Sequence, residues 1–300
     1  MKTALFIALT ITTVGFIVYW ITAMRGQSSM GDVKWTPGPV DALIGFVTNF
    51  FDTLGIGSFA PTTAIFKLRN LVRDEQIPGT LNVGHTLPTV AEAFIFIAIV
   101  AVDPLTLFSM IAASSLGAWL GAGIVARWPR RTVQIGMGIA LGVAAALMLH
   151  SQLSPDPAGG IDIGVTGVKL GIAVGVSIVL GALMTLGIGL FAPCMILVTL
   201  LGMNPKAAFP IMMGSCAFLM PVGSVRFIRE RSYNLKSALG LAIGGVPGVL
   251  IAAYIVKELS LRTVKWLVIV VVIYTAIMML RSAMQERARR PVVVMPSIGS

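Results

Sequence analysis

One nine-residue motif occurs twice in this chain, and its repetition decides how the chain is organised. Residues 53–61 read Thr-Leu-Gly-Ile-Gly-Ser-Phe-Ala-Pro, and residues 185–193 read Thr-Leu-Gly-Ile-Gly-Leu-Phe-Ala-Pro, with identity at eight of nine positions. The copies are 132 residues apart. Other matches keep nearly the same spacing: Pro78 with Pro210, Gly117 with Gly248, 124–125 with 255–256, and 131–133 with 262–264. The sequence therefore predicts two homologous halves.

The composition indicates that the chain lies in a membrane. Of its 300 residues 56% are hydrophobic and 11% are charged, and the mean hydropathy is +0.92. Soluble domains carry about 25% charged residues, so these side chains cannot form a water-exposed surface. Apolar runs of about 20 residues predict membrane-spanning helices. The first run, 4–24, lacks a small-x-small cleavage site, so we expect a retained helix rather than a cleaved signal peptide.

Two apolar stretches are interrupted. Segments 41–66 and 167–203 each contain Gly-x-Gly followed by Pro, a pattern typical of broken or re-entrant membrane helices. The predicted fold class is an all-α polytopic membrane protein of about seven to nine spans, with two inverted repeats containing broken helices and an extra N-terminal transmembrane helix. The predicted units are an N-terminal helix at 1–30, repeat 1 at 41–150, a linker at 151–166, repeat 2 at 167–282, and a basic, disordered tail at 283–300.

The distribution of charge predicts that the halves are inverted. Loop 67–75 is basic, whereas its counterpart 199–206 contains one lysine; the nearly uncharged turn at Asp103 corresponds to the basic loop 226–236. Basic loops stay on the cytoplasmic side, so swapped charge predicts swapped sides. One pair, 127–131 with 257–265, is basic in both halves and runs against this interpretation. We expect a multi-pass protein of a bacterial inner membrane; the oligomeric state stays open.

The second half resembles a known family. Its segment 185–252 contains Gly-Ile-Gly-x-x-x-Pro, the pair Leu201-Gly202, a basic turn at 226–236, and Gly-Gly-Val-Pro-Gly at 244–248. This pattern, and its copy in the first half, is similar to the TauE/SafE sulfite exporter family of membrane permeases. The resemblance implies movement of sulfite, sulfonates or related small organic anions, driven by a proton or ion gradient. Family members commonly have three glycines in a row where this chain has Ser58-Phe59 and Leu190-Phe191.

The repeated motif has the chemistry of an anion site. Broken helices offer free backbone N–H groups at their positive ends, and glycine lets an anion approach the main chain. Near the membrane midplane two such turns would face each other. Gly-x-Gly can instead serve only close helix packing. The predicted substrate-binding residues are Gly55, Gly57, Ser58, Thr62, Thr63, Thr185, Gly187 and Gly189, with Asn82 and Ser215 as residues that either line the site or cap helices.

The first half contains ionisable residues that the second half lacks at the corresponding positions. Asp52, His85 and Glu92 correspond to Met184, Ala217 and Ser224 in the second half. A charge at the middle of a span costs about 2.5–3.5 kcal/mol, so Glu92 is expected to be protonated, paired or in contact with water. His85 precedes Glu92 by seven residues and lies on roughly the same helical face. These three residues are candidates for coupling proton movement to anion movement; the alternative is a structural role in capping polar groups or lining a wet hairpin mouth.

Other classes of function find little support in the sequence. No HExxH, Walker or nucleophile-elbow motif is present, so no enzyme, cofactor or metal is predicted. The basic residues fall in short clusters between apolar segments, which predicts contact with lipid and no nucleic-acid partner. A passive anion channel stays an alternative. A thiol or electron carrier is less favoured because Cys194 corresponds to Thr62 and Cys216 to Gly84, so neither cysteine is duplicated.

Overall fold

The chain is almost entirely helical in the computed structural model. The structure describes residues 2–28, 36–55, 57–73, 76–124, 160–184, 190–258 and 261–288, with scattered positions between 135 and 153. Within these ranges the one β contact is an isolated bridge between Asp162 and Met203. The helices are α1 (Lys2–Ser28), α2 (Pro39–Thr53), α3 (Phe59–Arg69), α4 (Ile77–Ile99), α5 (Pro104–Ile124), α7 (Gly167–Met184), α8 (Phe191–Leu200), η3 (Pro205–Ala207), α9 (Ala208–Arg229), α10 (Leu235–Glu258) and α11 (Leu261–Ala288).

Four of the described helices are long and apolar enough to cross a membrane. They are α1, α4, α9 together with η3, and α10. Shorter apolar helices are found in α5 and α7. The predicted all-α polytopic membrane protein is therefore confirmed. Most of the apolar stretch 132–150, at the end of the predicted repeat 1, lies outside the described residues, and α11 continues to Ala288, beyond the boundary predicted for the tail.

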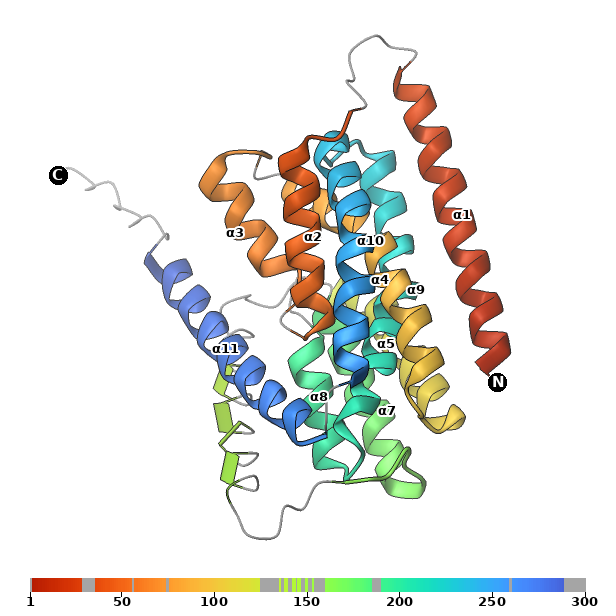
Figure 1. The fold of residues 1–300 in the computed structure, drawn as a ribbon, viewed down its shortest axis with the longest axis vertical. Coiled ribbons are helices and arrows are strands. Elements are labelled where there is room, and N and C mark those ends of the chain that lie inside the picture. The colour runs from red at the N-terminus through yellow and green to blue at the C-terminus, as the bar shows by residue number, and fades with distance from the viewer. Residues whose placement is uncertain are drawn as a thin grey trace, which may run out of the picture.

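The interrupted segments form two hairpins that open at opposite ends of the molecule (Figure 1). At the Gly38 end, α2 and α10 begin side by side, and the Asn234 backbone N–H donates to Thr80 Oγ1 near the start of α4 at 2.9 Å. At the Asp103 end, α5 and α7 begin, and the Asp103 N–H donates to Ile163 O at 2.8 Å. Hairpin α2–α3 opens toward the Gly38 end, and hairpin α7–α8 opens toward the Asp103 end.

The helix pairs that pack most closely join one half to the other. α2 lies along α10, α5 lies along α7, and α4 crosses α9. Glycines permit these close approaches: a methyl group at Gly244 would overlap Ala42 O, and one at Gly117 would overlap Ile178 O. Small residues of this kind let backbones touch where lipid supplies no hydrophobic driving force. The bundle is thus held by contacts between halves as well as within them.

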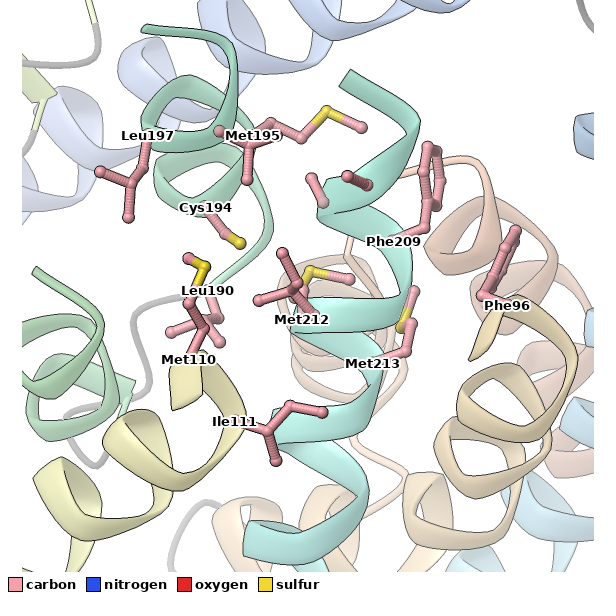
Figure 2. Packing of buried hydrophobic residues seen from close by; sticks show 14 of the residues in the cluster. Phe96, Met110, Ile111, Leu190, Cys194, Met195, Leu197, Phe209, Met212 and Met213 are labelled. Carbon is pink, nitrogen blue, oxygen red and sulfur yellow. The ribbon is translucent and has the colours of Figure 1, made fainter. Parts of the chain in front are cut away.

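The largest core lies between α4, α5, α8 and α9, and much of it is sulfur-containing (Figure 2). Phe96 and Phe209 stack with ring centroids 4.9 Å apart and join α4 to α9. Flexible methionines fill irregular gaps between helices. The labelled sulfur-containing residues are Met110, Cys194, Met195, Met212 and Met213, all buried.

Candidate functional site

The first glycine motif forms the turn of the α2–α3 hairpin. α2 ends at Thr53, and α3 begins at Phe59. Gly55 has a φ of 100° and Gly57 a φ of 87°, both in the left-handed region that side chains disfavour. A Cβ atom placed on Gly57 would meet nothing within 4 Å. The turn therefore leaves open space beside its main chain.

An acidic side chain already uses donors at this turn. Asp52 is half-buried in the last turn of α2, while Ser58 is almost fully buried just before α3. The hydroxyl and the backbone N–H of Ser58 lie close to the Asp52 carboxylate and act on it electrostatically. An acidic residue at a helix N-terminus is stabilised by the helix dipole. Donors that the sequence predicted for an external anion therefore face an internal carboxylate in this structure.

His85 links the two arms of the hairpin to α4. Its Nδ1 lies 2.9 Å from Asn49 Oδ1 on α2, and its Nε2 lies 3.1 Å from Thr62 Oγ1 on α3. Asn49 Nδ2 donates to Gly45 O at 2.7 Å. A carbonyl oxygen only accepts, so this bond fixes the amide orientation and leaves Oδ1 as an acceptor for His85 Nδ1–H. The three side chains are fully buried.

Glu92 lies two turns further along α4 and meets the end of α2. Its Oε1 is 2.7 Å from Thr53 Oγ1, and its Oε2 has no hydrogen-bond partner among the residues that the structure describes. Glu92 is fully buried, and the Asp52 carboxylate acts on it electrostatically. An ionised carboxylate in such a place is costly unless it is paired, so a buried acid within a membrane is a hypothesis of function in itself.

The remaining predicted residues lie apart from this group or outside the described residues. Thr63 is half-buried in α3. Asn82 Nδ2 donates to Pro78 O at 3.1 Å, and Ser215 Oγ donates to Ile211 O at 2.7 Å, so both satisfy their own helices. Thr185, Gly187 and Gly189, which belong to the second copy of the motif, lie outside the described residues.

Two residues of the cluster were missed as site residues by the sequence analysis. Asn49 joins His85 to α2, and Thr53 joins Glu92 to α2. A signal was available: Asn49, Asp52 and Thr53 are spaced three and four apart on one face of an otherwise apolar helix. Their partners on α4 belong to a different helix, and the sequence gives no pairing between faces of separate helices.

Apolar crossing helices, a glycine turn and buried ionisable groups at that turn together define a polytopic membrane protein with a polar cluster at a break in one hairpin. The family model described as Sulfite exporter TauE/SafE matches residues 169–299, which confirms the resemblance for that part of the chain. This family implies a membrane exporter-type transporter of sulfite or related anions. No curated protein and no solved structure matches the chain. The match covers the second half, whereas the polar cluster belongs to the first.

Proposed function

We propose that this protein is a secondary transporter that exports small sulfur-containing or organic anions, such as sulfite or sulfonates, by alternating access. The observation that carries the proposal is the glycine turn at 54–58, which interrupts an apolar hairpin and is surrounded by buried polar side chains. Broken helices of this kind form substrate sites in membrane transporters because they expose backbone donors away from lipid.

The arrangement of the helices supports alternating access. By the repeat spacing, α2 corresponds to α7 and α5 corresponds to α10. Exchanging the halves therefore converts the α2–α10 pair into the α7–α5 pair, and both pairs are among the closest in the bundle. The two hairpins also open at opposite ends (Figure 1). Such a relation is expected of inverted repeats, in which one half rocks against the other around a central site.

Charge supports an orientation in the membrane. The Gly38 end carries basic residues at the ends of α3 and α9 and at the start of α10, among them Arg69, Arg73, Arg226, Arg229 and Lys236. The Asp103 end carries acidic Asp103 and Asp162 beside its lysines. By the positive-inside rule the Gly38 end faces the cytoplasm. Arg262 and Lys265 at the start of α11 run against this assignment, as their counterparts in the first half did in the sequence.

Proton coupling is proposed for Glu92, with Asp52 and His85 as further candidates. Two carboxylates near one small anion repel it and each other unless protons are bound. The Ser58 hydroxyl and backbone N–H already act on the charge of Asp52, so an arriving anion competes with Asp52 for the start of α3. Binding a proton to this acidic pair lowers the cost of bringing the anion in. Proton occupancy of this pair and anion occupancy of the site are thereby coupled.

The direct test is ligand stabilisation of the purified protein. Its thermal unfolding is followed with sulfite, thiosulfate, sulfoacetate, sulfate and acetate, each added at matched ionic strength. A ligand that binds the native state adds about 2.7 kcal/mol at 100 times its dissociation constant, so a specific anion raises the melting temperature above the level of the others. Equal melting temperatures with every anion contradict the proposal. Flux into proteoliposomes then separates a coupled transporter from a passive channel, because only the former concentrates its substrate under an ion gradient.

A further inference from the structure

Two threonine hydroxyls, one on each arm of the α2–α3 hairpin, make the same kind of paired contact. Thr53 Oγ1 is 2.8 Å from Asn49 O, four residues earlier in its own arm, and 2.7 Å from Glu92 Oε1 on α4. Thr62 Oγ1 is 2.7 Å from Ser58 O, also four residues earlier, and 3.1 Å from His85 Nε2 on α4. Each hydroxyl thus stands between a backbone carbonyl beside the turn and an ionisable side chain of α4.

A hydroxyl has one proton, so it can donate in only one of these two directions. Asn49 O can only accept, and its 2.8 Å contact therefore needs the Thr53 proton. The Thr53–Glu92 contact then requires a proton from Glu92 itself. If Glu92 is ionised, the Thr53 hydroxyl must donate to Glu92 Oε1. Thr53 Oγ1 and Asn49 O would then face each other with no proton between them. Those atoms must then move apart.

The same count applies to His85. Asn49 Oδ1 accepts a hydrogen bond from Nδ1–H of His85, because the Asn49 amide nitrogen already donates to Gly45 O. The proton of neutral His85 is therefore on Nδ1. A proton on Nε2 is therefore present only in the imidazolium form, which donates to Thr62 and leaves the Thr62 hydroxyl for Ser58 O. When His85 is neutral, the Thr62 hydroxyl must donate to Nε2, and Ser58 O loses the hydrogen bond from that hydroxyl. Ser58 O belongs to the last residue of the turn, and Asn49 O lies one helical turn before it in α2.

We propose that Thr53 and Thr62 are positioning residues that couple proton occupancy of Glu92 and His85 to the geometry of the glycine turn at 54–58. This inference rests on the proposed function, because the coupled turn is the proposed anion site. No covalent bond of either threonine breaks. The hydroxyl hydrogen rotates between the carbonyl and α4, and the proton that enters or leaves is the one bound to Glu92 Oε1 or His85 Nε2.

The surroundings leave few competing groups. The titratable side chains that act on Glu92 are Asp52 of α2 and, across the bundle, Cys216 of α9. His85 contacts Asn49 of α2 and both Thr62 and Phe59 of α3. None of these three side chains gains or loses a proton near neutral pH. The other elements packed on α4 carry charged groups at their ends: Lys236 lies at the start of α10, Arg226 and Arg229 lie at the end of α9, and Lys2 of α1 donates to Ile97 O and Val100 O.

The second half does not contain this device. Thr62, His85 and Glu92 correspond to Cys194, Ala217 and Ser224, and Asn49 corresponds to Gly181. Among the residues that the structure describes, hydroxyls paired with ionisable groups of α4 are therefore found in the first hairpin. A proton-dependent change is expected at 54–58 and not at the corresponding turn.

Backbone hydrogen exchange tests the inference without any substrate. Exchange at residues 50–62 is measured at several pH values. Peptides of α1 from the same protein serve as the reference that corrects for the dependence of the intrinsic exchange rate on pH. In the wild type we expect the corrected protection of the turn to change with pH. The change is expected to be lost in a Thr53→Val/Thr62→Val double variant and retained in Thr53→Ser/Thr62→Ser. Thr48→Val is the matched control, since Thr48 is buried on the same helix and donates to Ile44 O at 2.7 Å.

Flux measurements then link the device to transport. In proteoliposomes, accumulation of sulfite driven by a pH gradient should fall by about tenfold in the valine double variant, equivalent to about 1.4 kcal/mol. The serine variants should restore accumulation. Equal pH dependence of exchange protection in wild type and valine variants overturns the inference. If the wild type moves no anion while its turn responds to pH through the threonines, the proposed function fails and the device stands.

Discussion

Gly245 of α10 is the position where packing between helices should control the polar cluster. A methyl group at this residue would lie 2.5 Å from both Asn49 Nδ2 and Pro88 Cγ. Ordinary contacts between heavy atoms are about 3.5–4.0 Å, so both contacts must lengthen by roughly 1 Å. The Pro88 ring is tied to the α4 backbone and cannot rotate away, so α10 must shift away from it, and the Asn49 amide must move as well. Its bonds to Gly45 O and His85 Nδ1 would then break.

The expected cost of Gly245→Ala follows from these contacts. Overpacking a well-filled interior costs about 1–3 kcal/mol, and each hydrogen bond lost adds about 0.5–1.5 kcal/mol. Replacing a helical glycine by alanine returns about 1 kcal/mol. The variant should therefore unfold at a lower temperature than the wild type in detergent, by an amount equivalent to about 1–5 kcal/mol. Its turn at 54–58 should also lose the pH response that depends on His85.

Gly175→Ala in α7 is the matched control. A methyl group at Gly175 would meet nothing within 4 Å, so only the gain in helix propensity remains. This variant should be as stable as the wild type or slightly more so. The reasoning is refuted if Gly245→Ala and Gly175→Ala unfold together and give the same pH profile, because Asn49 would then be free to move without consequence.

Three further variants test the site. Gly57→Ala should reduce anion flux because alanine at a φ of 87° costs about 1–2 kcal/mol; Gly202→Ala, at the same φ but at the end of α8, should lose similar stability and keep its flux. Glu92→Gln should abolish the dependence of flux on an imposed pH gradient, and an unchanged dependence removes Glu92 from coupling. The Cys194→Ser/Cys216→Ser double variant should transport normally, whereas loss of flux in a stable, folded double variant favours a thiol carrier.

The backbone of the hairpin was largely predictable from the sequence. Gly55 and Gly57 in an apolar segment, followed by Pro61, indicated a break between two short helices, and the structure has α2 end at Thr53 and α3 begin at Phe59. Proline in the first turn of a helix loses no hydrogen bond, which is why the break has this order. The apolar helices α4, α9 and α10 likewise follow from their length and hydropathy. These features depend only on residues near each other in the chain.

The polar cluster was only partly predictable because it depends on which helix faces meet. Asp52, His85 and Glu92 were singled out by their charge in an apolar setting. Asn49 and Thr53 were not, since an amide and a hydroxyl in a helix are common and usually bond to their own backbone. What makes them part of the site is the packing of α2 against α4 and α10, where Gly245 leaves room for the Asn49 amide. No local pattern reports that contact.

The two halves share a backbone pattern but differ in chemistry, and the difference bears on mechanism. In the first half the hairpin meets His85 and Glu92, whereas in the second half Cys194 lies in a sulfur-containing core between α5, α8 and α9 (Figure 2). A dry, apolar core of methionines supplies no group that binds a proton near neutral pH. If transport requires a proton to be taken up and released, that step is confined to the first hairpin. The second hairpin then serves as a packing partner of the first, and the proton gradient drives the transport cycle through the first hairpin.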